Sequence, residues 1–255
     1  MAERPTDTAE DLDDLLKRGA AALGVALDDQ QVAAFRHYRE LLLEWNARIN
    51  LTAITDPREI VVRHFLDSLS VALGVPATLR GEVARVLDIG SGAGFPGLAL
   101  AIAFPRWRVT ALEATSKKVR FLREVASALH LSGAHALEGR AEDLAHKREE
   151  RGHYDVVTAR ALAPLPTLLE YCEPFAKEGG VVIAPKKGDL AAELAAGGRA
   201  AAQLGGRMEA PVPVTIPDVL DDARVLVVVT QERPSLPLYP RQAGAPSKHP
   251  LGQGR

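Results

Sequence analysis

The stretch VLDIGSGAGFPG, residues 86–97, carries an apolar strand into a glycine-rich turn and then into a proline at the start of the next helix. Gly92, Gly94 and Gly97 match the spacing G-x-G-x-x-G, and the acidic Glu113 follows about 20 residues later. Turns of this kind bring backbone N–H groups close to nucleotide-like ligands. The pattern predicts a ligand-binding turn, and the glycines alone leave the kind of ligand open.

Segments with the periodicity of strands and of helices alternate after this turn. The alternation predicts an α/β fold with a Rossmann-like, mostly parallel, seven-stranded sheet that helices cover on both faces. Such sheets bind ligands beyond the carboxyl ends of their strands, where the strand order reverses. We expect strands at residues 85–90, 107–114, 134–139, 154–161, 179–186, 210–216 and 223–231, the last two as an antiparallel pair, and helices at 96–104, 116–131 and 189–204.

The part of the chain that precedes the sheet has the pattern of helices. Apolar residues recur at helical spacing within residues 9–23, 28–49 and 55–73, and Asp56 followed by Pro57 is a strong start signal for the last of these. The chain therefore divides into four parts. We expect an acidic, mobile segment at residues 1–27, a helical extension at 28–78, a Rossmann-like domain at 79–232 and a flexible, basic tail rich in proline and glycine at 233–255.

Charge is distributed unevenly along the 255 residues, although the formal net charge is only −2. The first 30 residues hold eight acidic and three basic side chains, whereas the last 23 hold four basic and no acidic ones. Contact with a nucleic acid must therefore come from local basic patches. Cys172 is the single cysteine, which excludes an internal disulfide and a cysteine-based zinc site. We expect no metal site, secretion signal or membrane span, and a cytoplasmic monomer.

Asp88, at the end of the first strand of the sheet, bears on the kind of ligand. A carboxylate there repels a pyrophosphate and favours a ligand with positive charge, such as the sulfonium and ammonium groups of S-adenosylmethionine. Pro96 removes an N–H group that a pyrophosphate would use. Glu113 can accept hydrogen bonds from both ribose hydroxyls of either ligand. These residues favour S-adenosylmethionine, and a dinucleotide such as NAD or FAD is the alternative.

Two later segments add candidate residues. In EGRAEDLA, residues 138–145, Glu142 and Asp143 either bond an adenine amino group or cap a helix. Arg160, in TARALAPL after the fourth strand, is either a cation beside the methyl donor or a member of a structural ion pair. The sequence has no Asn-Pro-Pro-Tyr-like motif after that strand and no Pro-Cys pair. These absences disfavour methylation of an adenine amino group and of carbon 5 of cytosine.

The order of five motifs resembles the RsmG (GidB) family of bacterial ribosomal RNA methyltransferases. The motifs are LLLEWNARINLTAITDPREIVVRHFLDSL, VLDIGSGAGFPG, EATSKKVRFL, GRAEDL and ARALAPL, and the resemblance covers roughly residues 30–232. It implies a class I S-adenosylmethionine-dependent methyltransferase that acts on N7 of one guanine, guanine-527 in the family, in 16S ribosomal RNA. That nitrogen has a lone pair and no proton, so a direct in-line displacement needs no general base. The tail YPRQAGAPSKHPLG also resembles a basic tail that many members carry.

The resemblance also indicates where ligands would bind. Arg160 would orient the substrate or the cofactor, and the partner would be 16S rRNA, free or in the small ribosomal subunit. An oxidoreductase that uses NAD or FAD, a cofactor-binding assembly factor and a methyltransferase for a small molecule are the alternatives. The cofactor contacts carried over by motif are Gly90, Phe95, Glu113, Ala114, Thr115, Ala141, Glu142 and Arg160, to which the glycine turn adds Asp88 and Gly92. The basic residues expected to bind RNA are Arg63, His64, Lys117, Lys118, Lys186, Lys187, Arg241 and Lys248.

Overall fold

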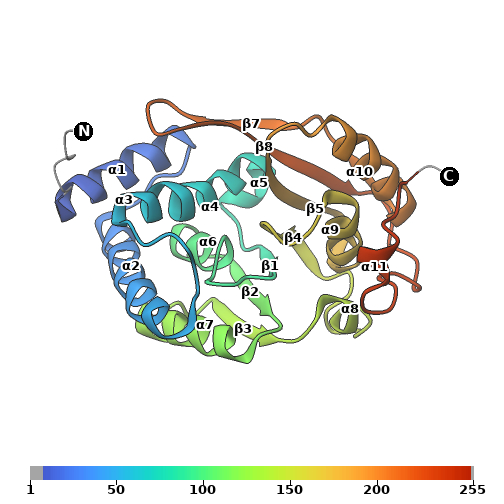
Figure 1. Cartoon of the computed structure of the whole chain (residues 1–255), viewed down its shortest axis with the longest axis horizontal. Helices are drawn as coiled ribbons and strands as arrows, with labels where there is room; N and C mark the ends of the chain where they lie inside the picture. The colour runs from blue at the N-terminus through green and yellow to red at the C-terminus, as the bar shows by residue number, and fades with distance from the viewer. Residues whose placement is uncertain (1–7, 254–255) are drawn as a thin grey trace.

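An eight-stranded sheet forms the centre of the molecule, which a computed structural model describes over residues 8–253. The strands are β1 (Arg85–Ile89), β2 (Arg108–Glu113), β3 (Ala134–Glu138), β4 (Tyr154–Thr158), β5 (Ala176–Lys187), β6 (Gly206–Met208), β7 (Val212–Ile216) and β8 (Leu220–Gln231). Seven of them form a row in the order β3-β2-β1-β4-β5-β8-β6, and β7 pairs with the first half of β8 (Figure 1).

Strands β3, β2, β1, β4 and β5 run parallel, and β8 runs antiparallel to β5, β6 and β7. The predicted mostly parallel sheet is confirmed, and so is the antiparallel pair near its end. All seven predicted strands are present, and β6 is an eighth that was not expected, because three residues are too few to show a periodic pattern. The strand order reverses between β1 and β4, so ligands are expected beyond the carboxyl ends of these two strands.

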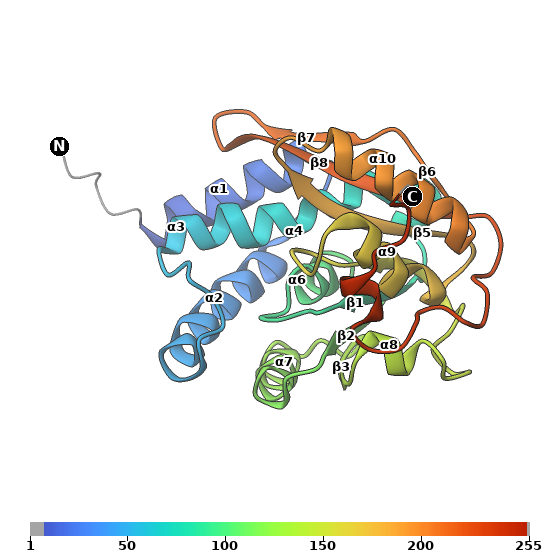
Figure 2. The same ribbon diagram turned by 45° about the vertical axis from the view of Figure 1, so that its right-hand side comes forward.

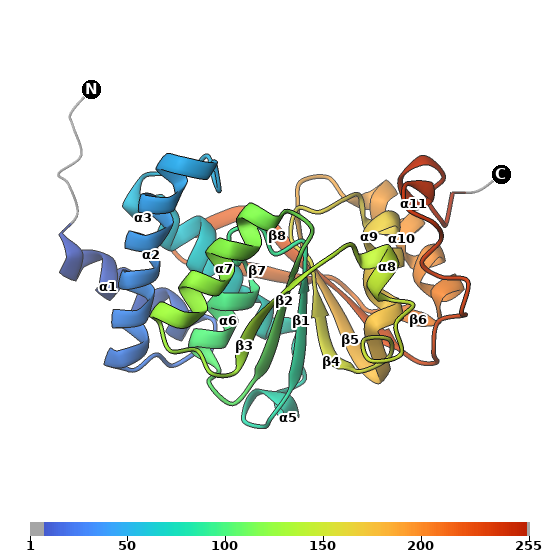
Figure 3. The same cartoon turned by 90° about the horizontal axis from the view of Figure 1, so that it is seen from below.

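Helices cover both faces of the sheet. One face carries α2 (Asp29–Ile49), α6 (Gly97–Ala103) and α7 (Ser116–Ala128), and the other carries α8 (Ala141–Leu144), α9 (Leu165–Cys172) and α10 (Ala191–Leu204) (Figure 3). Side chains alternate along each strand, so Val86 belongs to the hydrophobic core beneath α6 and Leu87 to the core beneath α9. Among residues 8–253, no helix combines the length and the apolar composition needed to cross a membrane.

The acidic N-terminal segment contains an ordered helix, α1 (Ala9–Ala22). Thr8 and Asp11 cap its start by exchanging hydrogen bonds between side chain and backbone. Leu12, Leu15 and Leu16 form a stripe that is buried against the rest of the helical extension. The structure therefore differs from the predicted mobile segment over residues 9–22, because this apolar stripe has a surface to pack on. Residues 1–7 lie outside the described part of the chain.

The third predicted helix is a continuous helical run with an irregular centre. It comprises α3 (Pro57–Ile60), the π-helical turn η1 (Val61–Leu66), α4 (Asp67–Leu69) and the 3₁₀ turn η2 (Ser70–Gly74). The predicted start signal is confirmed, since the Asp56 carboxylate accepts a hydrogen bond from the Glu59 N–H at 2.9 Å. Single π-helical turns within helices often occur at functional sites, and η1 carries Arg63 and His64.

The C-terminal tail packs along α9 and contains a short helix, α11 (Ala245–Lys248) (Figures 1 and 2). Tyr239, Pro246 and Leu251 are buried. Arg151 donates hydrogen bonds to the carbonyls of Ser235 and Tyr239, at 2.8 and 2.7 Å. The structure thus differs from the predicted flexible tail over residues 233–253. High proline and glycine content disfavours regular elements, but it does not prevent a segment from packing through side chains and carbonyl groups.

Candidate functional site

The glycine turn between β1 and α6 is held in place by the helical extension. Gly90, Gly92 and Gly94 have positive φ values of 70°, 60° and 91°, a region that side chains rarely adopt. A Cβ on Gly94 would lie 2.2 Å from the hydroxyl oxygen of Tyr38 on α2. That hydroxyl donates a hydrogen bond to the Ala93 carbonyl. The turn therefore needs glycine both for its backbone and for the close approach of α2.

Asp88 does not face the ligand side of this turn, which corrects our prediction. Its side chain is fully buried, and Oδ2 accepts hydrogen bonds from the Gly97 N–H at 2.9 Å and from the Ser91 hydroxyl. A Cβ on Gly97 would lie 2.8 Å from Oδ2. The carboxylate thus satisfies an otherwise free N–H group in the first turn of α6. Successive side chains of a strand point to opposite faces of the sheet. Leu87 and Ile89 belong to the core beneath α9, so the Asp88 side chain between them points towards α6.

Asp88 should make the stability of the protein depend on pH. Burial raises the pKa of Asp88 to about 6, and its two hydrogen bonds offset only part of that rise. Aspartate in an unfolded chain titrates near ~3.9. Between these values the folded state binds more protons than the unfolded state, so stability falls as pH rises. The wild type should lose about 2–3 kcal/mol from this group between pH ~4 and ~7, and Asp88→Asn should not.

Urea unfolding of both proteins across that pH range measures the difference. Asp143→Asn, which changes an exposed carboxylate, serves as the control and should keep the wild-type pH dependence. Parallel pH curves for Asp88→Asn and the wild type would contradict the expectation.

A cavity of about 450 Å³, here called the turn cavity, opens beyond the carboxyl ends of β1, β2 and β3. Glu113, at the end of β2, is nearly buried in its wall. Its two carboxylate oxygens accept hydrogen bonds from the N–H groups of Gly92 and Thr115, at 3.0 and 2.8 Å. Each oxygen keeps a further lone pair for a ligand donor. The cavity is lined by Ile89, Gly90, Leu112, Glu113, Ala114, Lys118, Gly139, Arg140, Ala141, Glu142, Arg160, Ala161, Leu162, Ala163, Tyr171 and Ser247.

The structure brings many of the predicted cofactor residues together at this cavity, namely Gly90, Glu113, Ala114, Ala141, Glu142 and Arg160. Gly92 and Thr115 contribute indirectly, through their hydrogen bonds to Glu113. Phe95 lies elsewhere, because its ring is buried against Tyr38 and His64. Sequence reasoning missed Tyr171 and Ser247, which lie on α9 and in the tail. They carried no local signal, since only the tertiary fold brings them to the cavity.

A second cavity of about 490 Å³, here called the basic cavity, lies between η1 and the ends of β4 and β5. Its wall contains five cationic side chains, Arg63, Arg160, Lys186, Lys187 and Arg224, and two acidic ones, Asp67 and Glu193. Arg160 and Ala161 line both cavities. A guanidinium group therefore stands where the two cavities meet. The rest of its wall is formed by Ile54, His64, Ala161, Pro185 and Leu190.

Arg160 is held on three sides. Its Nη1 donates to the Asp67 carboxylate at 2.6 Å and to the Arg63 carbonyl in the π-helical turn at 3.0 Å. Its guanidinium carbon lies 5.3 Å from the centre of the Phe95 ring, within the range of a cation–π contact. Asp67 also forms an ion pair with Arg224, so one buried carboxylate joins two arginines. Arg160 is therefore a member of a structural ion pair, which was one of its two alternatives. The same contacts orient its guanidinium between the two cavities.

His64 is an uncharged part of this arrangement, unlike the basic RNA contact that we predicted. Burial, reinforced by the charge of Arg160, lowers the pKa of His64 to about 4. Its Nδ1 lies 3.4 Å from Arg160 Nη2, which can only donate, so Nδ1 is the acceptor. Nε2 then carries the proton and donates to the Thr52 hydroxyl at 2.8 Å. The imidazole stacks on Phe95 with 4.5 Å between ring centres.

The other basic residues that we predicted to bind RNA differ in their contacts and exposure. Lys186 donates to Glu193 and to the Ala163 carbonyl, at 2.7 and 2.9 Å, so its charge is largely paired. Arg241 is bound to the buried Glu170, which corrects the prediction that it reaches RNA. Lys118 lines the turn cavity. Exposed positions are occupied by Arg63, Lys117, Lys187 and Lys248.

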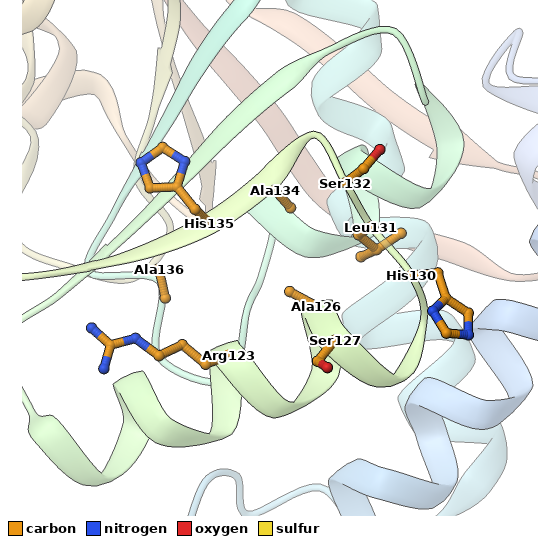
Figure 4. Close-up of a pocket in the computed structure, with 9 residues that line it drawn as sticks. All are labelled: Arg123, Ala126, Ser127, His130, Leu131, Ser132, Ala134, His135 and Ala136. Carbon is orange, nitrogen blue, oxygen red and sulfur yellow. The ribbon is translucent and has the colours of Figure 1, made fainter.

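A third depression, an open groove of about 450 Å³ between α7 and β3, lies outside this site (Figure 4). His130 and His135 stand at opposite ends of it (Figure 4). β3 is the edge strand of the row, so the groove is away from the reversal of strand order between β1 and β4. Its lining includes none of the predicted site residues.

Comparison with solved structures supports the fold. The chain superimposes on a predicted O-methyltransferase from Agrobacterium tumefaciens with a TM-score of 0.52 and 22% identity, over 66% of this chain and 81% of that one. It also superimposes on a fibrillarin pre-rRNA processing protein from Methanococcus jannaschii with a TM-score of 0.50 and 19% identity, over 64% and 74% of the two chains. Both show the same fold, that of class I methyltransferases.

Sequence comparison goes further than the fold. A family model described as rRNA small subunit methyltransferase G matches residues 31–215. A protein named ribosomal RNA small subunit methyltransferase G from Roseiflexus sp. (strain RS-1) is 46% identical over 93% of this chain and 99% of its own length. One of the same name from Dehalococcoides mccartyi (strain CBDB1) is 45% identical over 91% and 97%. These matches confirm the resemblance read from the motifs: the chain belongs to the rRNA small subunit methyltransferase G family.

Proposed function

We propose that this protein transfers a methyl group from S-adenosylmethionine to N7 of one guanine in 16S ribosomal RNA. The observation that carries the proposal is the position of Arg160, whose side chain lines the turn cavity and the basic cavity together. A cofactor in the first cavity and a base in the second would meet at this residue. Family membership supports the class of substrate, since the relatives are named for the RNA of the small ribosomal subunit.

The turn cavity fits the proposed cofactor. Its volume lies within the ~300–1,000 Å³ typical of small-molecule sites. Glu113 has free lone pairs for two ribose hydroxyls. Gly90 leaves room beside the turn, where a Cβ would lie 2.7 Å from Leu162. Ile89 and Leu112 supply apolar surface. This fit does not involve Asp88, whose carboxylate accepts a hydrogen bond from the Gly97 N–H at the start of α6.

The basic cavity suits a guanine extruded from folded RNA. Enzymes that modify a base take it out of the stack, and a base in a loop costs least to extract. The excess of cationic side chains around the cavity attracts the phosphates on either side of such a base. Arg160 can donate to the guanine oxygen or to a phosphate, which leaves the N7 lone pair free.

Positioning is the main task of these residues in the proposed reaction. When bound, S-adenosylmethionine supplies an electrophilic methyl group that the unprotonated N7 can attack in line with the sulfur, so no base has to remove a proton first. Asp67 and the Arg63 carbonyl accept hydrogen bonds from the guanidinium of Arg160, and the Phe95 ring forms a cation–π contact with it. Good placement of two reactants contributes on the order of 7–11 kcal/mol to lowering a barrier.

The proposal is tested by methyl transfer from labelled S-adenosylmethionine to 16S rRNA that lacks the mark, as naked RNA and within small subunits. We expect incorporation of label into at least one of these substrates and none into 23S rRNA. Calorimetric titration should show binding of S-adenosylmethionine and none of NAD(H). Binding of NAD(H) alone would support the oxidoreductase alternative and contradict the proposal.

Lys187 should contribute to RNA affinity as a phosphate contact. It is exposed at the carboxyl end of β5 and lines the basic cavity. Lys187→Ala should lower the slope of log K for RNA binding against log salt by about 0.7–0.9, because one phosphate contact is lost. Affinity for the cofactor should stay unchanged. Lys177→Ala, which removes an exposed lysine at the other end of β5, is the matched control, and an equal effect of both substitutions would contradict the assignment.

A further inference from the structure

The tail is fixed to α9 by an ion pair with a fully buried carboxylate. Glu170 on α9 has no exposed surface. The Arg241 side chain donates to its two oxygens at 2.8 and 2.6 Å, and the Arg241 backbone N–H donates to it at 2.9 Å. This two-pronged geometry is the one that arginine and carboxylate adopt in their strongest pairs. Arg241 therefore sets the path of the tail where it reaches α9.

Further contacts hold the segment after Arg241 in register. Thr167 on α9 donates to the Pro246 carbonyl at 3.0 Å, and Pro246 itself is buried. Arg199 on α10 donates to the Gly252 carbonyl at 2.7 Å. A Cβ on Gly252 would lie 2.1 Å from the Ala196 carbonyl oxygen, so the tail runs directly against α10. The short helix α11 is thereby placed between two anchors.

These anchors put Ser247 into the wall of the turn cavity. Its hydroxyl lies 3.2 Å from the hydroxyl of Tyr171, which also lines that cavity. Arg140 and Glu142, in the segment after β3, line it too. Burial raises the pKa of Tyr171, so its hydroxyl keeps its proton and can both donate and accept. Two hydroxyls that are 76 residues apart in the sequence thus form one edge of the cavity.

We propose that the C-terminal tail is a structural part of the cofactor site, with Ser247 and Tyr171 closing the end of the turn cavity that receives the adenine. This inference rests on the proposed binding of S-adenosylmethionine there. The segment after the third strand lines the adenine in folds of this class, and here its helix α8 contacts α9, which carries Tyr171. Adenine offers an amino donor and ring-nitrogen acceptors, which two hydroxyl groups can match.

The tail is thereby assigned a role in cofactor affinity. Arg241, its most firmly bound cation, is turned inward. Because coupling is reciprocal, a tail that helps to bind the cofactor must itself be stabilised when the cofactor binds. The affinity for the cofactor and the stabilisation of the tail can be measured separately on the same protein.

The first measurement is calorimetric titration with S-adenosylhomocysteine, which contains the adenine and lacks the transferable methyl group. Ser247→Ala should weaken binding about three- to tenfold, the effect of one lost hydrogen bond. Arg241→Gln should weaken it at least tenfold, because the whole edge of the cavity is released. Lys248→Ala, which changes an exposed side chain of α11 outside the lining of the cavity, should bind like the wild type.

The second measurement is hydrogen exchange of residues 241–251 with and without S-adenosylhomocysteine. Exchange should slow on binding in the wild type and respond less in Ser247→Ala, while strand β1 exchanges equally in both proteins. If the wild type binds neither S-adenosylmethionine nor S-adenosylhomocysteine, the proposed function fails. If it binds them, but Ser247→Ala binds equally well and the tail exchanges at the same rate in both states, the role of the tail alone is overturned.

Discussion

Replacing Arg160 by alanine is expected to lower kcat/KM for methyl transfer to rRNA by about 100- to 1,000-fold, the range seen when a preorganised polar group is removed from an active site. The guanidinium is fixed by Asp67 and the Arg63 carbonyl. Among the described residues it is the one charged side chain that lines both cavities. Removing it also leaves Asp67 with Arg224 alone. Most of the loss should appear in kcat, because placement of the acceptor is what is disturbed.

Two further variants separate charge from geometry at this position. Arg160→Lys keeps the charge and loses the planar fork, so it should recover only part of the rate. Arg48→Ala removes an exposed arginine that pairs with Glu44 on α2, and it should have wild-type kinetics. Single-turnover rates with 16S rRNA, together with calorimetric affinity for S-adenosylmethionine, give the measurement. Wild-type turnover by Arg160→Ala would remove Arg160 from the account of catalysis.

Replacing Asp67 by asparagine should have the largest effect on stability. Its carboxylate is nearly buried and pairs with Arg160 at 2.6 Å and with Arg224. The neutral amide would leave the guanidinium of Arg160 without a counter-charge and that of Arg224 with Asp222 alone. Breaking a buried ion pair from one side costs about 3–5 kcal/mol. The free energy of unfolding, measured by urea titration, should fall by about this amount.

Asp222→Asn is the matched control for that substitution. Asp222 also binds Arg224, through two hydrogen bonds of 2.8 Å, but its side chain is about one-third exposed. Solvent can replace much of that interaction, so the loss of stability should be near 1 kcal/mol or less. A double-mutant cycle of Asp67→Asn with Arg160→Ala should show strong coupling, because the two residues share one contact. Equal losses from the two aspartate variants would contradict the central position given to Asp67.

The sheet and part of the site could be predicted because they follow from local patterns. The period of the apolar residues predicted the strands, and their alternation with helices predicted that they are parallel. Parallel strands bring their carboxyl ends to one edge of the sheet. Glu113 ends β2, and Glu142 and Arg160 come shortly after β3 and β4; the structure brings all three to the turn cavity. Family motifs added Ala114 and Ala141, which line the same cavity.

The parts that could not be predicted depend on tertiary contacts. Arg241 looks like a free cation in sequence, and only the fold places the buried Glu170 opposite it. The π-helical turn that carries Arg63 and His64 had no signal of its own, since its sequence also suits a regular helix. Asp88 is the contrasting case. Its direction towards α6 follows from the alternation of side chains along β1, which its charge does not indicate.

The central claim is transfer of a methyl group to N7 of one guanine, and borohydride reduction followed by aniline tests it most directly, because this treatment cleaves RNA only where guanine carries a methyl group on N7. Unmethylated 16S rRNA, as naked RNA and in small subunits, should be incubated with S-adenosylmethionine and either the wild type or Arg160→Ala. We predict one new cut at a single guanine with the wild type and little or none with the variant. Incorporation of labelled methyl groups into this RNA without any cut would place the methyl group on another atom and contradict the account.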